Sequence, residues 1–419
     1  MASVVIVGGG IAGLVVARDL VLGGMTVTLL EASDHLGGKV ARHTVAGIEL
    51  DAGAESFATR RGTVAELARQ LGLESAIVPP SPDGAWLQTV AGSAFPLPKT
   101  GILGIPGTPM ASDVIEVIGF WAALRAQLDE LMLGFVGAKE KSLGRLVRRR
   151  MGDAVLERLV APVTLGIHSK HPDDLDVDVV APGLRTALLR TGSLSHAVRQ
   201  LREAAPAGSA VAGISGGMFE LVEALRRDLD RFGVTVRLST PVTSVDSSGA
   251  TVADGERFDA DHVVLATSLG RSEQASIVLA TLVVDAPELD SAPRGTGVLV
   301  AAGTPGIRAK ALTHATAKWR WLADNVGASR HVLRLSYNQA PVDGLRELAI
   351  EDARQLLGVP LNAASIIGFD RVEWAAPAAA PDVVSGVTAV GEGVSGTGLA
   401  AVVRHARNEA ERLLKDIDG

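Results

Sequence analysis

Three glycines near the start of the sequence have the spacing that brings polypeptide backbone close to a phosphate group. Gly8, Gly10 and Gly13 follow an apolar run, SVVIV, and open a segment with helical periodicity. In such a turn the first glycine permits a tight bend, the second admits a pyrophosphate, and the third lets the helix pack against the strand. The helix N-terminus then offers free amides and partial positive charge to the phosphates. The pattern therefore predicts a dinucleotide site.

Two later features indicate which dinucleotide this is. Glu31 ends the next apolar strand, where a carboxylate accepts hydrogen bonds from a ribose. Soon after it, Gly37-Gly38-Lys39 again brings bare backbone near a phosphate and adds a cation. NAD and FAD share the strand, turn and helix, but a Gly-Gly-Arg or Gly-Gly-Lys at this spacing accompanies FAD in the glutathione-reductase-like flavoproteins. We therefore predict FAD.

A second glycine pattern, Gly391-x-Gly393-x-x-Gly396, lies between a predicted strand and a predicted helix. The sequence ends at Gly419, which leaves no length for the second strand and ribose carboxylate of another dinucleotide unit. We expect these glycines to bring backbone amides to another part of the same cofactor, with Gly398 facing the flavin.

The sequence His168-x-x-His171, followed by Asp173 and Asp174, has a spacing that could ligate a metal ion. The segment HPDD is also a common turn and N-cap composition, and no further ligands accompany it. We therefore predict no metal site. The histidines and serines show no nucleophile-elbow or triad pattern, so the sequence disfavours hydrolase chemistry.

A segment of aromatic and basic residues fits either a substrate site or ordinary structure. Trp319 and Trp321 could line an aromatic cage, although packing in a core or on a sheet face is the preferred interpretation. Four cations in the same region fit either an anionic substrate or a scattered, solvated surface: Lys310, Lys318, Arg320 and Arg334.

The secondary structure that must hold these groups follows from hydrophobic periodicity. The apolar runs 4–7 and 25–30 predict buried parallel strands on either side of a helix. Other predicted elements are helices over 63–72, 113–160 (clearest over 115–133) and 181–205, irregular Pro/Gly-rich structure or a domain crossing over 79–109, short strands with one helix near 345–357 inside 270–370, and a closing strand, glycine turn and helix.

Composition limits the classes of protein that remain. A chain of 419 residues predicts more than one domain. The net charge of −7 disfavours a nucleic-acid partner. The absence of cysteine removes disulfides, iron–sulfur clusters and thiolate nucleophiles, and suits a cytoplasmic protein. Mean hydropathy of +0.27, with no long uninterrupted apolar segment, predicts no spanning helix and leaves open a peripheral contact with the inner face of the membrane.

Several segments together resemble one family. GGGIAGL, LLEAS with LGGKV, and LDAGAESFATRR are similar to segments of the bacterial porphyrinogen oxidases of haem synthesis, which act on coproporphyrinogen III or protoporphyrinogen IX and belong to the flavin amine-oxidase superfamily. The likeness continues through SLGRLVRRRMGD, GGMFELVEALRRDL, TPV, VVLATS, HVLRLSY and GVSGTGLAAVV, and so covers nearly the whole chain.

The resemblance implies an α/β fold with three parts. A Rossmann-type, glutathione-reductase-like FAD-binding domain would comprise 1–79, 206–269 and 371–419. A discontinuous α+β substrate domain would comprise 80–112 and 270–370. A helical subdomain at 113–205 is the part expected to face a membrane.

The resemblance also implies cofactor-binding residues. Within GAESFATRR, backbone is expected along FAD, and Arg60 is a candidate for the substrate's carboxylates together with Lys310 and Trp319. The residues expected to bind FAD are Gly8, Gly9, Gly10, Ile11, Ala12, Gly13, Glu31, Ala32, Gly38, Lys39, Gly53, Ala54, Glu55, Ser56, Val242, Trp374, Gly391, Thr397, Gly398 and Leu399.

The implied reaction is oxidation of a tetrapyrrole. In the family a porphyrinogen gives hydride to the flavin in three two-electron rounds, and O2 accepts the electrons as H2O2. The cofactor carries that chemistry, so no catalytic acid or base is assigned. A resemblance to sequences of high-GC Gram-positive bacteria implies coproporphyrinogen III as the preferred substrate. The sequence does not indicate an oligomeric state.

Two departures keep other interpretations open. The family's usual segment after the Trp374 position is missing, and His168 and His171 replace the family's Tyr and Asp in the mid-chain turn. The alternatives are another flavin enzyme of the superfamily, either an amine oxidase or a desaturase, and a degenerate flavin-binding homologue. The single tyrosine, Tyr337, makes the usual aromatic cage for an amine hard to build.

Overall fold

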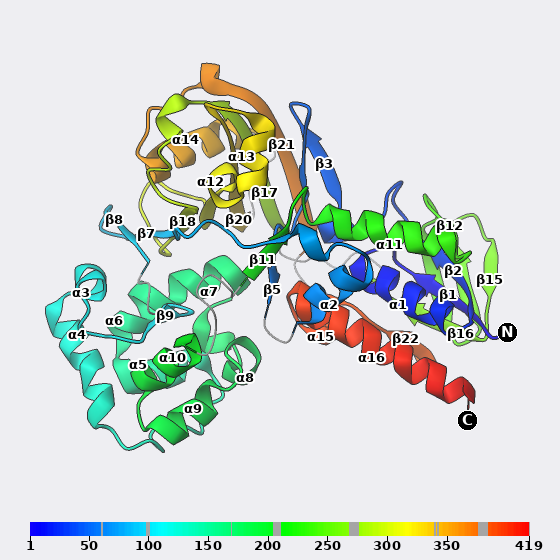
Figure 1. Ribbon diagram of the computed structural model, residues 1–419, viewed down its shortest axis with the longest axis horizontal. Helices are drawn as coiled ribbons and strands as arrows, with labels where there is room; N and C mark the ends of the chain where they lie inside the picture. The colour runs from blue at the N-terminus through cyan, green and yellow to red at the C-terminus, as the bar shows by residue number, and fades with distance from the viewer. Residues whose placement is uncertain are drawn as a thin grey trace. The chain divides into compact units, whose positions relative to one another are not determined.

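The chain forms two compact units, each assembled from separate segments. The computed structural model describes residues 1–59, 62–97, 101–168, 170–203, 211–267, 276–338, 341, 343–375 and 384–418. The first unit comprises Met1–Pro80, Ala210–Ile277 and Val372–Gly419; the second comprises Ser81–Ser209 and Val278–Arg371 (Figure 1). The division into three functional domains remains a prediction.

A five-stranded parallel sheet forms the centre of the first unit. Its order is β12 (Thr235–Arg237), β2 (Thr26–Leu30), β1 (Ser3–Val7), β16 (His262–Leu265) and β22 (Val387–Ala389). Because both faces are covered, the strands read as continuous apolar runs.

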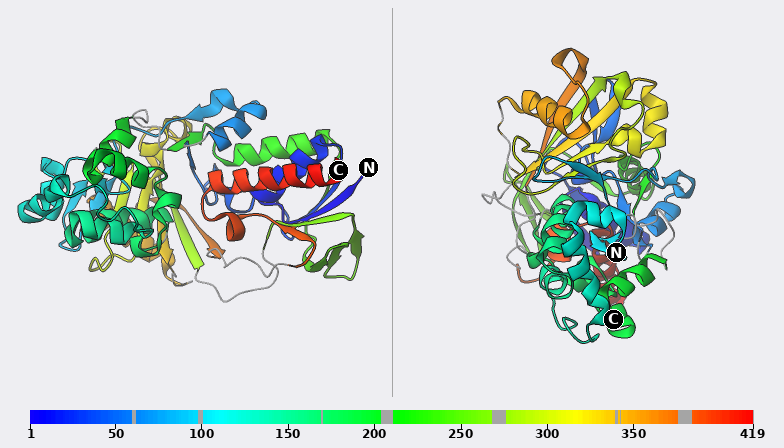
Figure 2. Two further views of the ribbon diagram at one scale, coloured as in Figure 1. Left: turned by 90° about the horizontal axis from the view of Figure 1, so that it is seen from below. Right: turned by 90° about the vertical axis from the view of Figure 1, so that its left-hand side faces the viewer.

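The two faces of this sheet have different coverings. Val4 and Ile6 of β1 pack in the core formed with α1 (Ile11–Leu22), α11 (Phe219–Arg231) and α16 (Leu399–Asp418). Val5 and Val7 point the other way, into a small core with the antiparallel sheet of β13 (Val242–Asp246), β14 (Gly249–Val252) and β15 (Arg257–Asp259). Figure 2 (left) shows α11 and α16 on one side of the sheet and β13–β15 on the other.

Short elements complete the first unit around the sheet. They are η1 (Gly38–Val40), the hairpin β3 (Arg42–Val45) with β4 (Ile48–Asp51), α2 (Thr63–Gln70), η2 (Glu74–Ala76), α15 (Glu392–Ser395), and the small sheet of β5 (Phe57–Ala58), β11 (Val211–Ile214) and β6 (Ile77–Val78).

A seven-stranded sheet organises part of the second unit. Its order is β21 (Ile366–Ala375), β17 (Ser276–Asp285), β20 (Arg330–Asn338), β19 (Ala311–His314), β18 (Gly297–Val300), β7 (Trp86–Gln88) and β8 (Ala94–Pro96). Alternate residues of β17, such as Ala280 and Leu282, pack in one core with α14 (Leu345–Leu357). This period of two is the pattern of a strand that contributes one face to the core.

The structure corrects two expectations in this unit. The Pro/Gly-rich segment is not irregular throughout, because β7 and β8 join the large sheet and β9 (Gly101–Ile102) pairs with β10 (Ile105–Pro106). The expectation of one helix within 270–370 is also wrong. Besides α14 there are α12 (Ala315–Lys318) and α13 (Arg320–Val326), together with the 3-10 turns η6 (Pro287–Leu289) and η7 (Ala363–Ser365). Such short helices carry too little periodicity to be distinguished from the strands around them.

The other part of the second unit is helical, but the segment 115–133 is not one helix. Gly119 has φ +85° and separates α3 (Ser112–Ile118) from α4 (Phe120–Gln127). In that left-handed region a glycine is favoured and an α-helix cannot continue. The remaining elements are η3 (Leu128–Leu131), α5 (Leu143–Met151), α6 (Asp153–Val155), the π-helical η4 (Leu156–Val160), α7 (Ala161–His168), η5 (Pro172–Asp174), α8 (Val177–Val180), α9 (Leu184–Thr191) and α10 (Leu194–Glu203).

A buried ion pair fixes one loop of this helical part. Arg150 and Asp129 are fully buried, and Arg150 Nε donates to Asp129 Oδ1 at 2.5 Å. The same guanidinium donates to the carbonyls of Leu133 and Val136 at 2.9 and 3.2 Å. Because a buried charge needs a complete set of partners, these bonds hold the loop after η3 in one conformation.

Candidate functional site

The glycine turn between β1 and α1 has the geometry that its spacing predicts. Gly8 has φ +108°, and its N–H donates to Leu30 O at 2.8 Å. A Cβ added to Gly13 would lie 2.0 Å from Gly8 O, so only glycine lets α1 begin this close to the strand. The first and third glycines of the pattern are therefore required by the fold itself.

Gly10 differs, because the fold leaves the space beside it open. It is the N-cap of α1 with φ −70° and ψ 175°, a conformation available to any residue. No side chain caps the helix, and a Cβ added to Gly10 would meet nothing within 4 Å. The fold thus leaves room beside the uncapped N-terminus of α1, the positive end of the helix, whose first turn contains Ile11 and Ala12. A pyrophosphate fits this arrangement.

Glu31 is held beside the same turn. Its Oε2 accepts from Gly9 N at 2.6 Å, and its Oε1 accepts from Ser33 N and Oγ at 2.8 and 2.7 Å. Thr240 N donates to the Glu31 carbonyl at 2.8 Å, which places the segment before Val242 next to the backbone of Glu31. Val242 is half-buried and Ala32 is exposed. Carboxylate oxygens accept more than one bond each, so a ribose hydroxyl can still bind.

The Gly-Gly-Lys segment packs directly on the glycine turn. Gly37 N donates to Gly9 O at 2.8 Å, and Gly37 and Gly38 both have positive φ. Lys39 reaches Glu392 of α15, with 2.6 Å between Nζ and Oε2. Two segments from opposite ends of the sequence are therefore joined by an ion pair at this turn.

The GAES segment packs against the Gly-Gly-Lys segment in turn. Ala54 N donates to Lys39 O at 2.8 Å, and a Cβ added to Gly53 would lie 2.4 Å from the same oxygen. Trp374 Nε1 donates to Ala52 O at 3.4 Å. Glu55 and Ser56, which follow, are half-buried. Ala52 and Trp374, which are far apart in the sequence, thus meet beside the Gly-Gly-Lys segment.

The C-terminal glycines complete this set of segments. Gly391 is buried with φ +105°, and a Cβ there would lie 3.8 Å from the Cβ of Ala12. Thr397 and Gly398 are exposed, and a Cβ added to Gly398 would meet nothing within 4 Å. Leu399 starts α16 directly afterwards. We call this group of segments the glycine cradle: residues 8–13, 31–32, 37–39, 53–56, 242, 374 and 391–399.

The glycine cradle fits a dinucleotide with a flavin. It offers uncapped amides at the start of α1, a held carboxylate, and a second glycine turn with a lysine. It also offers exposed backbone at residues 397 and 398. These features are of the kinds that a pyrophosphate, a ribose and a ring system need.

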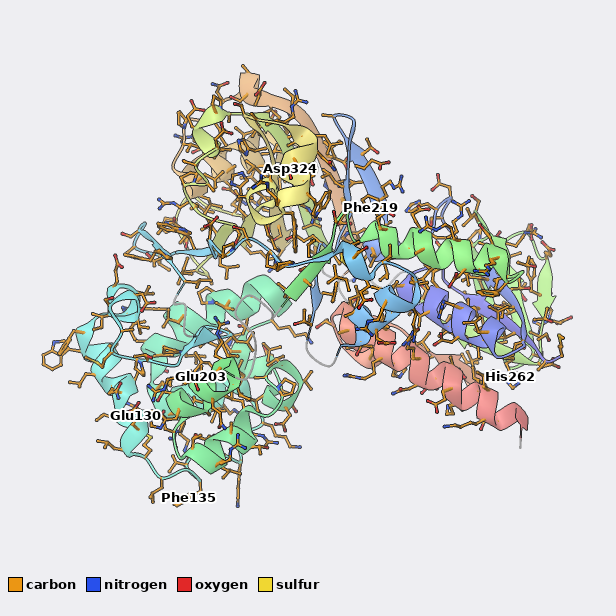
Figure 3. The ribbon with its side chains drawn as sticks, viewed as in Figure 1. Glu130, Phe135, Glu203, Phe219, His262 and Asp324 are labelled. Carbon is orange, nitrogen blue, oxygen red and sulfur yellow. The ribbon has the colours of Figure 1, made fainter. Side chains whose placement is uncertain are left out.

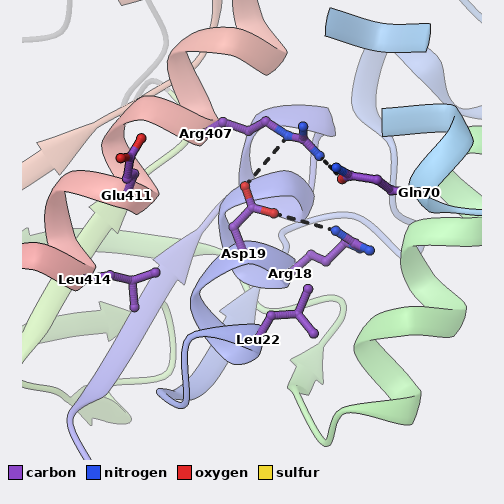
Figure 4. A pocket seen from close by; sticks show the side chains of 7 residues that line it. All are labelled: Arg18, Asp19, Leu22, Gln70, Arg407, Glu411 and Leu414. Carbon is purple, nitrogen blue, oxygen red and sulfur yellow. Dashed lines mark hydrogen bonds and ion pairs between the residues drawn. The ribbon is translucent and has the colours of Figure 1, made fainter. Parts of the chain in front are cut away.

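One pocket of the first unit lies away from the cradle. It has a volume of about 470 Å³ and is lined by the C-terminal halves of α1 and α16, whereas the cradle lies at their N-terminal ends. Asp19 lies 3.7 Å from Arg18 and 3.8 Å from Arg407, and Arg407 also donates to Gln70 (Figure 4). Burial raises the pKa of Asp19, opposed by the two arginines. The other charged side chains have partners outside the pocket, since Arg18 donates to Asp228 and Glu411 accepts from Lys415. We assign the pocket no role.

The three predicted substrate residues are not all described. Arg60 lies outside the described residues. Lys310 is half-buried in the second unit, and its Nζ donates to Asn338 Oδ1 at 3.2 Å. Burial lowers the pKa of Lys310 to about 8. Trp319 is 3% exposed, with Lys318 Nζ 5.1 Å from its ring centroid, so its burial favours the packing interpretation.

The histidine and aspartate residues of the mid-chain turn have structural partners. His171 is the N-cap of η5, where its Nδ1 accepts from Asp173 N at 3.3 Å. Arg148 bonds both oxygens of Asp173 at 3.1 Å and lowers the pKa of that carboxyl. His171 and Asp173 therefore adopt the turn and N-cap arrangement that is the alternative to a metal site. The side chain of His168 lies outside the described set.

The fold and the cradle define a dinucleotide-binding protein of the Rossmann type, and comparison with known proteins identifies the family. The model of the flavin containing amine oxidoreductases matches residues 11–294. The chain belongs to this family, which confirms the predicted FAD cofactor, the FAD-dependent oxidoreductase class and the predicted fold class.

Individual relatives agree with this assignment. A coproporphyrinogen III oxidase of Propionibacterium freudenreichii is 26% identical over 85% of this chain and 77% of its own length. A coproporphyrinogen III oxidase of Staphylococcus aureus is 27% identical over 76% of this chain and 74% of its own. The crystal structure of a protein from Exiguobacterium sp. 255-15, assigned as a protoporphyrinogen oxidase, has a TM-score of 0.83 at 24% identity and covers 99% of both chains.

Sequence patterns missed two sets of polar residues. Glu392 and Ser33, which hold Lys39 and Glu31, stand beside glycine patterns but have no spacing rule of their own. A hydrogen-bonded chain of Asp290, His331 and His314 in the second unit also escaped notice. No local signal could have found it, because its members come from three different elements.

Proposed function

We propose that the protein is an FAD-dependent porphyrinogen oxidase that transfers electrons from its substrate to O2 with release of H2O2. The observation that supports this most is the combination of the glycine cradle with coproporphyrinogen III oxidases among the relatives. FAD, when bound, would supply the hydride acceptor for three oxidation rounds. The chain's own task is to bind and orient both molecules.

Different residues of the glycine cradle would contact different parts of the cofactor. The amides of residues 10–13 would bind the pyrophosphate, Glu31 the adenosine ribose, and the backbone near Val242 the adenine. Lys39 and residues 53–56 would lie along the cofactor, and Thr397 with Gly398 would meet the flavin ring. Glu55 is placed with this backbone and is not proposed as a base.

We infer coproporphyrinogen III as the preferred substrate, with Arg60 and Lys310 as proposed contacts. Trp319 is left out of this set because it is 3% exposed. A lysine suits the propionates only while it is charged. Because the pKa of Lys310 is about 8, its charge is lost as the pH rises through that value. We therefore expect KM for a propionate-bearing substrate to rise above pH 8, and Lys310→Met to remove that rise. An unchanged pH profile in the variant would remove Lys310 from the site.

A direct assay tests the activity and the preference together. The FAD-loaded protein is given each porphyrinogen in air, and porphyrin fluorescence and H2O2 are followed. We expect three molecules of H2O2 per porphyrin and a higher kcat/KM for coproporphyrinogen III. The amine-oxidase alternative is disfavoured because Tyr337 is 1% exposed in the core with α14 and cannot line a cage. Turnover of amines without turnover of porphyrinogens would reverse this choice.

We also propose that the helical part of the second unit makes a peripheral membrane contact. No helix among the described residues is long and apolar enough to cross a membrane. However, α4, η3 and the following loop expose large apolar side chains, and Phe135 extends outward in Figure 3. Monomeric proteins rarely expose so many together without a partner. The exposed side chains are Phe120, Trp121, Leu124, Leu128, Leu131, Leu133 and Phe135.

Vesicle binding tests this contact. The triple variant Trp121→Ser, Leu131→Ser, Phe135→Ser should no longer sediment with anionic phospholipid vesicles. Val90→Ser, an exposed apolar residue of the same unit outside these elements, is the matched control and should bind as the unaltered protein does. Equal binding by the triple variant and the control would contradict the proposal.

A further inference from the structure

The exposed apolar side chains of the helical part lie on one side of two successive helical segments. η3 follows α4 directly, and Trp121, Leu124, Leu128 and Leu131 recur at spacings of three or four residues, which places them on one face. These residues are 39% to 81% exposed, whereas Ala123 on the opposite face is fully buried. A helix that faces water ordinarily carries polar residues on its outer side. In Figure 1, α4 lies at the outer edge of the helical part.

The loop after η3 and the end of α9 extend this face. Leu133 and Phe135 are 65% and 68% exposed, and Leu189 in the last turn of α9 is 59% exposed. A Cβ added to Gly134 would lie 3.1 Å from Gly192 Cα and 3.6 Å from Leu189 O, so the two segments are side by side. We call the exposed residues of both segments the apolar surface: Phe120, Trp121, Leu124, Leu128, Leu131, Leu133, Phe135 and Leu189.

The buried Arg150 holds these two segments together. Its guanidinium donates to Leu133 O at 2.9 Å in the loop and to Gly192 O at 2.8 Å after α9. Its partner Asp129 also accepts from Ser193 Oγ at 2.7 Å. Because one buried ion pair is bonded to both segments, the apolar surface is formed before any partner binds. A partner therefore has little ordering entropy to overcome.

Two cations lie beside the apolar surface. Lys139 follows the loop that carries Phe135, and Arg190 follows Leu189 in the last turn of α9. Both are exposed, and neither has an ion-pair or hydrogen-bond partner in the part of the chain that the structure describes.

The acidic residues nearby do not neutralise these cations. Residues 179–202, which include α9, contain no aspartate or glutamate. The segment 120–141 contains three acidic residues, each engaged by another side chain: Asp129 by Arg150, Glu130 by Arg199 at 3.5 Å, and Glu140 by Arg149 at 3.2 Å. The apolar surface therefore has unpaired positive charge beside it. Trp, Phe and Leu on one side with Lys and Arg next to them is the composition of helices that lie in a membrane interface.

We propose that the apolar surface binds anionic phospholipid membranes in preference to neutral ones, with Lys139 and Arg190 contacting the phosphate headgroups. α4 and η3 lie in the plane of the membrane, and their apolar side chains enter the boundary between headgroups and acyl chains. Each cation near anionic headgroups strengthens binding about fivefold. This preference rests on the peripheral membrane contact proposed above and names the lipid that it requires.

Two vesicle compositions test the preference with the FAD-loaded, full-length protein. One is phosphatidylcholine alone, and the other is phosphatidylcholine mixed with phosphatidylglycerol. We expect about tenfold or more tighter binding to the mixed vesicles, measured by co-sedimentation. Raising the salt concentration should remove the difference, because salt screens the attraction between exposed cations and headgroups.

A double variant and a matched control assign the preference to the two cations. Lys139→Gln with Arg190→Gln should bind the mixed vesicles about tenfold or more weakly than the unaltered protein, and should bind the neutral vesicles equally well. The control is Arg308→Gln with Arg330→Gln, which changes two exposed arginines of the same unit outside the apolar surface. It should bind both kinds of vesicle as the unaltered protein does.

The possible results separate this proposal from the membrane contact itself. Equal affinity of the unaltered protein for both compositions would overturn the lipid preference and leave the contact in place. Binding to neither composition would contradict both. A double variant that binds the mixed vesicles as tightly as the control does would remove Lys139 and Arg190 from the site. If light scattering finds a dimer that Trp121→Ser, Leu131→Ser, Phe135→Ser converts to a monomer, the apolar surface belongs to a second copy of the chain and the proposal is wrong.

Discussion

The glycine cradle of the first unit and a pocket of the second unit lined by Asp290, His314 and His331 are built by opposite means. In the cradle, small residues let backbone approach backbone, as where a Cβ on Gly13 would meet Gly8 O at 2.0 Å. In the pocket, polar side chains from separate elements are hydrogen-bonded in a chain that includes two buried histidines. The cradle is therefore sensitive to added volume, whereas the pocket is sensitive to lost hydrogen bonds and to protonation.

The largest expected effect comes from adding one methyl group in the cradle. Gly13→Ala forces a Cβ against a backbone oxygen, so we expect the free energy of unfolding to fall by about 4 kcal/mol or more, with loss of FAD. Gly10→Ala is the matched change at the open position. It should leave the melting temperature of the FAD-free protein unaltered and weaken FAD about tenfold or more. Equal loss of stability in both variants would contradict the distinction between the two glycines.

Removing a buried charge in the second unit should be nearly as severe. Arg150→Leu leaves Asp129 buried without its cation, which typically costs about 3 to 4 kcal/mol of unfolding free energy. The double change with Asp129→Leu should recover part of the loss. Urea denaturation measures both, and Arg149→Leu, whose side chain is exposed, serves as the control. A loss no larger than that of the control would show that the ion pair does not hold this loop.

Lowering the pH should destabilise the protein through His314. The pKa of His314 falls from 6.5 unfolded to about 3 folded. Between these values the unfolded state binds more protons, so stability is lost as the pH falls below 6.5. For this group alone the loss between pH 7 and pH 5 is about 2 kcal/mol. The difference in melting temperature between the two pH values should be smaller in His314→Leu, and an undiminished difference would contradict the assignment of a neutral, buried ring.

The smallest effect is expected from the ion pair that joins the two ends of the chain at the cradle. The side chains of Lys39 and Glu392 are 39% and 28% exposed, so their contact contributes about 0.5 to 1 kcal/mol of stability. Lys39→Met should weaken FAD more than Glu392→Gln does, because Lys39 is also proposed to lie along the cofactor. Fluorescence titration of the FAD-free variants with FAD checks this order, and the reverse order would assign the cofactor contact to Glu392.

The sequence predicts the cradle better than the pocket for a physical reason. Gly8, Gly13 and Glu31 act through local turn geometry, so their spacing in the sequence is also their spacing in space. Long strands and helices such as α14 follow from periodicity for the same reason. Asp290, His331 and His314 meet only because the turn after η6, the start of β20 and the end of β19 are brought together in the fold. The short helices α12 and α13, which the sequence did not predict, form the wall of that pocket.

Anaerobic reduction of the bound flavin tests the central claim most directly. The purified, FAD-loaded protein is mixed with coproporphyrinogen III in the absence of O2, and flavin absorbance is followed together with porphyrin fluorescence. We expect rapid bleaching of the flavin by coproporphyrinogen III, with fluorescence appearing at the same time and the flavin recovering when O2 is admitted. Bound FAD that neither coproporphyrinogen III nor protoporphyrinogen IX reduces would contradict it.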